Sequence, residues 1–129
     1  MVFRVDEIAY EYDQMIVVTG KTHAGEIKGV WKYREKPVKN QRYFVELSYD
    51  IFEKKISKSS DKILNVSMDE YVNTFYGEID GMDEEVFYIR FAVDWLDMMI
   101  SEDASSELRT GDYVTYSVKY QNTKIYPYD

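Results

Sequence analysis

The chain has 129 residues, of which 24 are acidic and 16 are basic, and its formal net charge is −8. It contains no cysteine, which excludes a disulfide framework, a cysteine nucleophile and a thiolate metal site. Charges at Arg4, Asp6 and Glu7 interrupt the start of the chain, and no later apolar run reaches the roughly 18 residues that span a bilayer. We therefore expect a single cytoplasmic domain over residues 1–129 that does not bind a membrane.

Apolar and polar residues alternate at period two along much of the chain, which is typical of half-buried strands. The 13 tyrosines, 6 phenylalanines and 2 tryptophans also favour strands over helices. In chain order, the expected strands are residues 2–10, 14–20, 26–33, 42–52, 70–79, 85–95 and 113–122. Turn residues lie between them, as in "GKTHAG" and "SKSSDK". The pattern predicts an all-β fold, a small antiparallel barrel or sandwich of about seven strands.

The clearest expected strand, residues 85–95, continues into an apolar segment, "FAVDWLDMMI", that carries two carboxylates. If Phe87, Val93 and Trp95 face the core, Asp94 points outward and needs no partner. Asp97 would fall on the core face if the same strand continued, and a buried carboxylate costs several kcal/mol unless it is paired. The strand is therefore expected to break or bulge near residues 95–97.

Two local structures would produce such a break. Either Asp94 caps a helix, or a bulge carries the strand to residue 100 and Ser101 caps a short helix near 101–108. The second has the stronger start signal, because two acidic residues follow Ser101 and a glycine lies just past the end. In both structures Asp94 and Asp97 have a structural role. The alternative is that they belong to an acidic docking face.

Charge is distributed unevenly along the chain. Residues 63–112 hold thirteen carboxylates against two arginines, whereas residues 26–62 hold ten basic residues against six acids. The acidic segment either solvates the surface or forms a face that attracts a basic partner, and tyrosines among carboxylates favour the second interpretation. The candidate partner-binding residues of this acidic face are Glu70, Tyr76, Glu78, Asp80, Glu84, Tyr88, Asp94, Asp97, Glu102 and Asp103.

No motif in the chain indicates catalysis. The single histidine, His23, lies in a glycine-bounded loop, where a solvated turn residue is favoured over a general base. The acidic loop 80–85 lacks the ligand spacing of an EF-hand, and a hairpin turn explains it. We expect no enzyme activity, metal or cofactor, and instead an inhibitor or immunity-type protein that neutralises a basic protein partner such as a nuclease toxin.

A second hypothesis starts from the basic segment 28–44, because aromatic platforms flanked by cations bind single-stranded nucleic acid in small barrels. Its candidate residues are Lys28, Trp31, Lys32, Tyr33, Arg34, Arg42 and Phe44. The segment "VVTGKTHAGEIKGVW" resembles the first hairpin of OB-fold barrels, and "LRTGDYVTYSV" resembles their turn and closing strand. The resemblance implies an OB-like barrel and carries no functional residue to this chain. The net charge argues against a polyanionic ligand.

Overall fold

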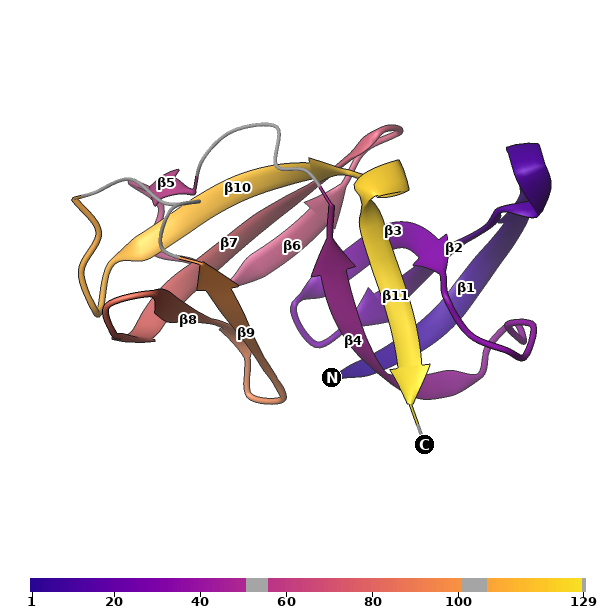
Figure 1. Ribbon diagram of the computed structural model, residues 1–129, viewed down its shortest axis with the longest axis horizontal. Helices are drawn as coiled ribbons and strands as arrows, with labels where there is room; N and C mark the ends of the chain where they lie inside the picture. The colour runs from indigo at the N-terminus through magenta and orange to yellow at the C-terminus, as the bar shows by residue number, and fades with distance from the viewer. Residues whose placement is uncertain (51–55, 101–106, 129) are drawn as a thin grey trace.

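The computed structural model describes residues 1–50, 56–100 and 107–128, and their strands form one continuous sheet (Figure 1). The strands are β1 (Val2–Tyr10), β2 (Ile16–Thr22), β3 (Gly25–Trp31), β4 (Arg42–Tyr49), β5 (Ser57–Lys58), β6 (Asn65–Met68), β7 (Val72–Met82), β8 (Val86–Ala92), β9 (Trp95–Ile100), β10 (Tyr113–Lys119) and β11 (Thr123–Tyr128). Two short 3-10 turns, η1 (Tyr12–Gln14) and η3 (Tyr120–Asn122), are the helical elements of the described residues. The predicted all-β class is confirmed.

Five of the strands close into a barrel. β1 pairs with β2 and with β4, and β2 pairs with β3. β11 closes the circle because it pairs antiparallel with β4 and parallel with β3. The strands follow one another around the barrel in the order β1-β2-β3-β11-β4, and the predicted small barrel is confirmed.

The two segments that resemble OB-fold barrels have different places in the structure. Residues 17–31 form the β2–β3 hairpin of the barrel, as expected. Residues 113–118 lie in β10, which is outside the barrel, and the closing strand is β11 instead. β11 contains Pro127, which lies opposite Val45 of β4. The backbone N–H and C=O of Val45 point away from β11 and bond Met1. The proline is tolerated there because this position requires no donor.

Strands β5 to β10 form a second group beside the barrel (Figure 1). The long strand β7 has β10 along one edge and β6 and β8 along the other, and β9 follows β8. The buried side chain of Asn73 connects this group to the barrel. Its Oδ1 accepts the Lys28 N–H (2.9 Å), and its Nδ2 donates to the Lys28 carbonyl (2.7 Å) and to Thr123 Oγ1 (3.2 Å). Asn73 therefore replaces a backbone pair between β7 and β3.

The core follows the period-two pattern on β7 and β8. Phe75 on β7 is fully buried and stacks on Tyr116 of β10, with ring centroids 4.8 Å apart. Phe87 and Phe91 on β8 are also buried, each burial stabilising the fold by roughly 1.5–3 kcal/mol. The expected core position of Val93 is wrong. This residue is 97% exposed, because β8 ends at residue 92 and residues 93–94 form a hairpin turn.

The predicted strand 85–95 is therefore two strands, and the break falls two residues before the expected position. β9 then runs to residue 100, as the preferred interpretation proposed. The described residues form eleven strands instead of about seven, because β5 and β6 are short, β9 follows a turn without glycine or proline, and β11 contains a proline. Most of the expected helix near 101–108 lies at residues 101–106, outside the described residues.

Candidate functional site

The face of β7, β8 and β9 that points away from the core is partly exposed and has apolar side chains at its centre. We call this surface, made by Glu78, Tyr88, Arg90, Leu96 and Met98, the outer face. Arg90 is paired with Glu78 on one side and Leu96 on the other, and Tyr88 is paired with Met98. Met98 is 66% exposed and Leu96 is 43% exposed. Exposed methionine beside tyrosine is typical of protein-binding surfaces.

Carboxylates surround one end of the outer face, at the β7–β8 turn. Asp83 shapes this turn, because its Oδ1 accepts the N–H groups of Glu85 and Val86, both at 3.0 Å. Asp80 lies 3.3 Å from the Arg90 guanidinium and is partly neutralised by it. Asp83, Glu84 and Glu85 are exposed. The acidic loop 80–85 is therefore the end of a hairpin, with its turn at residues 83–85.

The structure brings together about half of the residues predicted for the acidic face. The residues on the β7–β8 hairpin are Tyr76, Glu78, Asp80, Glu84 and Tyr88. Glu70 is exposed in the β6–β7 turn, at the other end of β7. Glu102 and Asp103 lie outside the described residues. Asp94 and Asp97 do not belong to this face, and their environments differ from those expected.

Asp94 lies in the β8–β9 turn. The prediction that it points outward without a partner is wrong. Its Oδ2 accepts the Val2 N–H at 2.9 Å, and its Oδ1 lies 2.9 Å from His23 Nδ1. Burial raises the pKa of Asp94, but the Val2 N–H and the His23 ring together outweigh burial, so the pKa is lowered. Asp94 therefore fastens this turn to β1 and to the β2–β3 turn. His23 is an exposed turn residue, as expected, but it contacts a carboxylate.

Asp97 lies on the core side of β9. This is the face on which the alternation of the sequence placed it for an unbroken strand. Its Oδ2 accepts a hydrogen bond from the Tyr49 hydroxyl (2.9 Å), and its Oδ1 accepts one from Trp95 Nε1 (3.0 Å). Both donors are neutral, and Asp97 forms no ion pair among the described residues. Burial raises the pKa of Asp97 to about 6 despite these two hydrogen bonds. The carboxyl group therefore titrates close to neutral pH.

The two tyrosines near Asp97 remain hydrogen-bond donors over the whole physiological range. Burial, together with the negative charge of Asp97, raises the pKa of Tyr49 and of Tyr116 well above the ordinary value. The Tyr116 hydroxyl lies 3.5 Å from that of Tyr49 and donates toward it. Sequence reasoning identified Asp97 as unusual but missed Tyr49, which is 48 positions away along the chain.

Asp97 also lines a cleft of about 750 Å³ between β4 and β9. One wall is formed by residues 45–49 and the other by residues 93–99, with Met1 and Tyr128 among the remaining lining residues. This volume lies within the range of small-molecule sites. We call this feature the strand cleft, because a strand forms each wall.

Of the aromatic residues predicted for the basic segment, Trp31 is buried and Phe44 is exposed. Trp31 is only 5% exposed; its ring packs against Tyr43 (4.9 Å between centroids) and its Nε1 donates to the Glu35 carbonyl (2.8 Å). The Lys28 ammonium lies over the ring of Tyr120, at 4.1 Å. Trp31 cannot stack on a nucleic-acid base, because its side chain belongs to the core.

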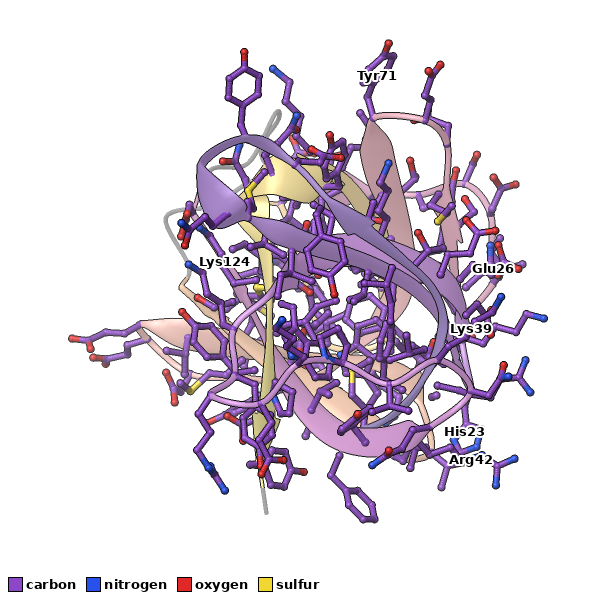
Figure 2. All side chains as sticks on the ribbon, turned by 90° about the vertical axis from the view of Figure 1, so that its right-hand side faces the viewer. His23, Glu26, Lys39, Arg42, Tyr71 and Lys124 are labelled. Carbon is purple, nitrogen blue, oxygen red and sulfur yellow. The ribbon has the colours of Figure 1, made fainter. Side chains whose placement is uncertain are left out.

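The pairing register places three cations side by side on the barrel instead. Arg4 on β1 is the direct partner of Arg42 on β4 and of Lys21 on β2, and we call these three residues the cation row. They line a groove of about 490 Å³ with His23 and Phe44, and Figure 2 shows His23 and Arg42 at the same edge of the molecule. Like charges directly opposite one another on neighbouring strands are destabilising.

Among the described residues, one carboxylate forms ion pairs with the cation row. Asp6 lies 3.3 Å from Arg4 Nε and 3.9 Å from Lys21 Nζ. Phe44 beside the row is 60% exposed and lies 6.3 Å from the ring of Tyr128. Sequence reasoning selected Arg42 and Phe44 but missed Arg4 and Lys21, which only the strand register brings next to them.

The described residues contain no group of three or more histidine, aspartate or glutamate side chains that could hold a metal ion. They also contain no helix of the length and apolarity needed to cross a membrane. Comparisons with protein-family models, curated proteins and solved structures find no match to this chain. A functional interpretation therefore depends on the surfaces themselves.

Proposed function

We propose that this protein is a small acidic binding protein that docks on a basic protein partner and acts by covering that partner's surface, without catalysis. The observation that carries this proposal is the outer face, where Leu96 and Met98 are exposed beside Tyr88. Its concrete form is a cytoplasmic inhibitor or immunity-type protein that neutralises a nuclease toxin.

The chemistry of the outer face supports a basic partner. Protein interfaces place apolar and aromatic side chains at the centre and polar residues at the rim. Here the rim at the β7–β8 turn is acidic, with Asp83, Glu84 and Glu85 exposed. Carboxylates at a rim increase the association rate with a positively charged surface, and the nucleic-acid-binding surface of a nuclease is positively charged.

The test is inhibition of a panel of purified basic nucleases by the protein and its variants. Leu96→Lys and Met98→Lys place a charge at the centre of the outer face, whereas Glu70→Lys makes a larger charge change at the distant β6–β7 turn. We expect inhibition of at least one nuclease, weakened about tenfold or more by the first two variants and much less by the third. If no nuclease is inhibited, or if the three variants behave alike, the proposal is wrong.

The cation row favours a second candidate function, the binding of single-stranded nucleic acid on the barrel. Arg4, Lys21 and Arg42 supply phosphate contacts, and the exposed ring of Phe44 supplies a stacking surface. Labelled single-stranded DNA should then bind at low salt, and Arg4→Gln with Arg42→Gln should weaken binding and flatten its salt dependence. Lys39→Gln is the matched control, and an absence of binding at low salt removes this candidate.

A further inference from the structure

The strand cleft is bordered by two strand edges that have no strand partner among the described residues. Residues 46–48 of β4 pair with β11 on one side, while the pairing of β4 with β1 ends where Phe44 meets Val2. β9 pairs with β8 on one side only. Both edges line the same cleft, so an extended segment placed there would have a strand on each side.

The backbone groups of β4 at this edge point into the cleft. The Val45 N–H donates to the Met1 carbonyl (2.9 Å), and the Met1 amino group donates to the Val45 carbonyl (3.2 Å), so Val45 faces the line of β1. Backbone groups along a strand alternate between its two sides. The backbone groups of Leu47 therefore face the same way as those of Val45, into the space beyond Met1.

The same alternation identifies the open groups of β9. The Val86 carbonyl accepts the Asp83 N–H at 2.9 Å, so the backbone of Val86 faces β7. The next residue of β8 consequently faces β9, and so does every second residue after it. In the observed register, this leaves the backbone groups of Leu96 and Met98 on the open edge of β9.

The two edges run in the same direction along the cleft. Asp94 contacts Val2 at one end, and Asp97 contacts Tyr49 at the other. Figure 1 shows the β4 and β9 arrows pointing the same way. Tyr49 and Asp97 connect the two walls through side chains rather than through a backbone pair. One strand antiparallel to both edges can thus bond Leu47 on one side and Leu96 and Met98 on the other.

The charges in the cleft select the chemistry of such a strand. Glu46, Asp94 and Asp97 line it, and so do two cations that already have acceptors. The Arg90 guanidinium bonds the Asp80 carboxylate and the Val93 carbonyl, both within 3.3 Å, and the Met1 amino group donates to the Val45 carbonyl. Asp97 has neutral donors only, and a buried carboxylate is greatly stabilised by a cation that donates hydrogen bonds to it. A lysine or arginine side chain reaching Asp97 would supply that cation.

We propose that the strand cleft receives one extended segment of the basic partner, antiparallel to β4 and β9, with a lysine or arginine side chain on Asp97. This inference rests on the proposed function for the nature of the partner and adds the mode of binding. The segment would also extend the sheet next to Leu96 and Met98, so the cleft and the outer face would form one continuous docking surface.

The test uses a capped synthetic octapeptide that alternates threonine and valine and carries one central lysine, with its affinity measured by isothermal titration calorimetry. We expect binding to weaken about tenfold when norleucine replaces the lysine. This difference should disappear in Asp97→Asn and persist in the control variant Glu70→Gln. A peptide that does not bind, or that binds equally well with norleucine, overturns the proposal.

Backbone methylation tests the two-edge geometry independently of charge. One set of alternate peptide amides faces β4 and the other faces β9, so N-methylation of either set should abolish binding. A strand added to a single edge would tolerate one of the two sets, which would contradict the proposal. Amide chemical shifts of Leu47, Leu96 and Met98 report the location, and shifts confined to other residues also overturn it.

The outcomes separate this inference from the proposed function. A nuclease inhibited through the outer face, with no peptide bound in the cleft, leaves the proposed function standing and refutes the strand geometry. Peptide binding that depends on Asp97, with no nuclease inhibited, establishes the cleft and refutes the nuclease partner.

Discussion

Replacing Asp97 with asparagine should stabilise the protein at neutral pH and have little effect in mild acid. Burial raises the pKa of Asp97 from 3.8 to about 6, so the folded state holds this proton more tightly than the unfolded state does. The resulting stabilisation is fully present below pH 3.8 and is lost as the pH rises through about 6. A rise of this size corresponds to about 3 kcal/mol of unfolding free energy.

Asparagine reproduces the hydrogen bonding of the protonated carboxyl group. Trp95 Nε1 is only a donor, so the amide oxygen accepts from it, and the amide nitrogen then donates to the Tyr49 oxygen. The Tyr49 hydroxyl can then donate toward the Tyr116 oxygen, 3.5 Å away, in place of the present donation from Tyr116 to Tyr49. Hydrogen bonds to a carboxylate are stronger than those to an amide, so we expect a net gain of about 1–3 kcal/mol at pH 8.

The assay is urea denaturation of the wild-type protein and Asp97→Asn at pH 5, 6, 7 and 8. Taking the difference between the two proteins cancels the titration of all other groups. That difference should grow by about 1.4 kcal/mol in favour of the variant between pH 5 and pH 8. A variant that is less stable at pH 8, or a difference that does not change with pH, would refute the argument from burial.

Two further predictions concern residues whose environments sequence reasoning misjudged. Asp94→Asn should lower the unfolding free energy at pH 7 by about 1 kcal/mol, because the Val2 N–H and His23 lose a charged partner. The pKa of Asp94 is lowered, so this cost should fade as the pH falls below about 4 in the same denaturation series, and a constant cost would contradict the lowered pKa. Trp31→Ala should cost about 3–5 kcal/mol in a thermal melt because the ring is buried, and an unchanged melting temperature would show that it is exposed.

Much of the fold could be predicted because alternation is a local property of a strand. The predicted limits of residues 2–10 agree with β1, and the expected core face was right for Phe87 and Phe91. The turn at residues 93–94 was missed because it contains neither glycine nor proline, and its valine reads as one more strand position. β11 was missed because Pro127 argues against a strand unless the pairing is known.

The candidate site could be predicted only where a local signal existed. Asp97 breaks the alternation of its own strand, so its misfit was visible in the sequence. Its partner Tyr49 comes from β4, and no local pattern connects two residues 48 positions apart. The cation row has the same origin, because Arg4 meets Lys21 and Arg42 through the pairing of three strands. A charge count along the chain averages over such registers and therefore misses them.

Proton binding to Asp97 and binding of the proposed cleft ligand are linked equilibria, because both depend on the ionisation of the same carboxyl group. A lysine that binds only ionised Asp97 competes with the proton, so its affinity should rise about tenfold between pH 5 and pH 8 and then level off. Tyr49 and Tyr116 stay protonated over this range because their pKa values are raised. Two other charges act on Asp97: the N-terminal amine lowers its pKa and the charge of Glu46 raises it. An apolar occupant such as the norleucine peptide would instead exclude water from the carboxylate, favour its protonated form and bind more weakly as the pH rises. The sign of the pH dependence therefore distinguishes a cationic ligand from an apolar one, even where their affinities at a single pH are similar.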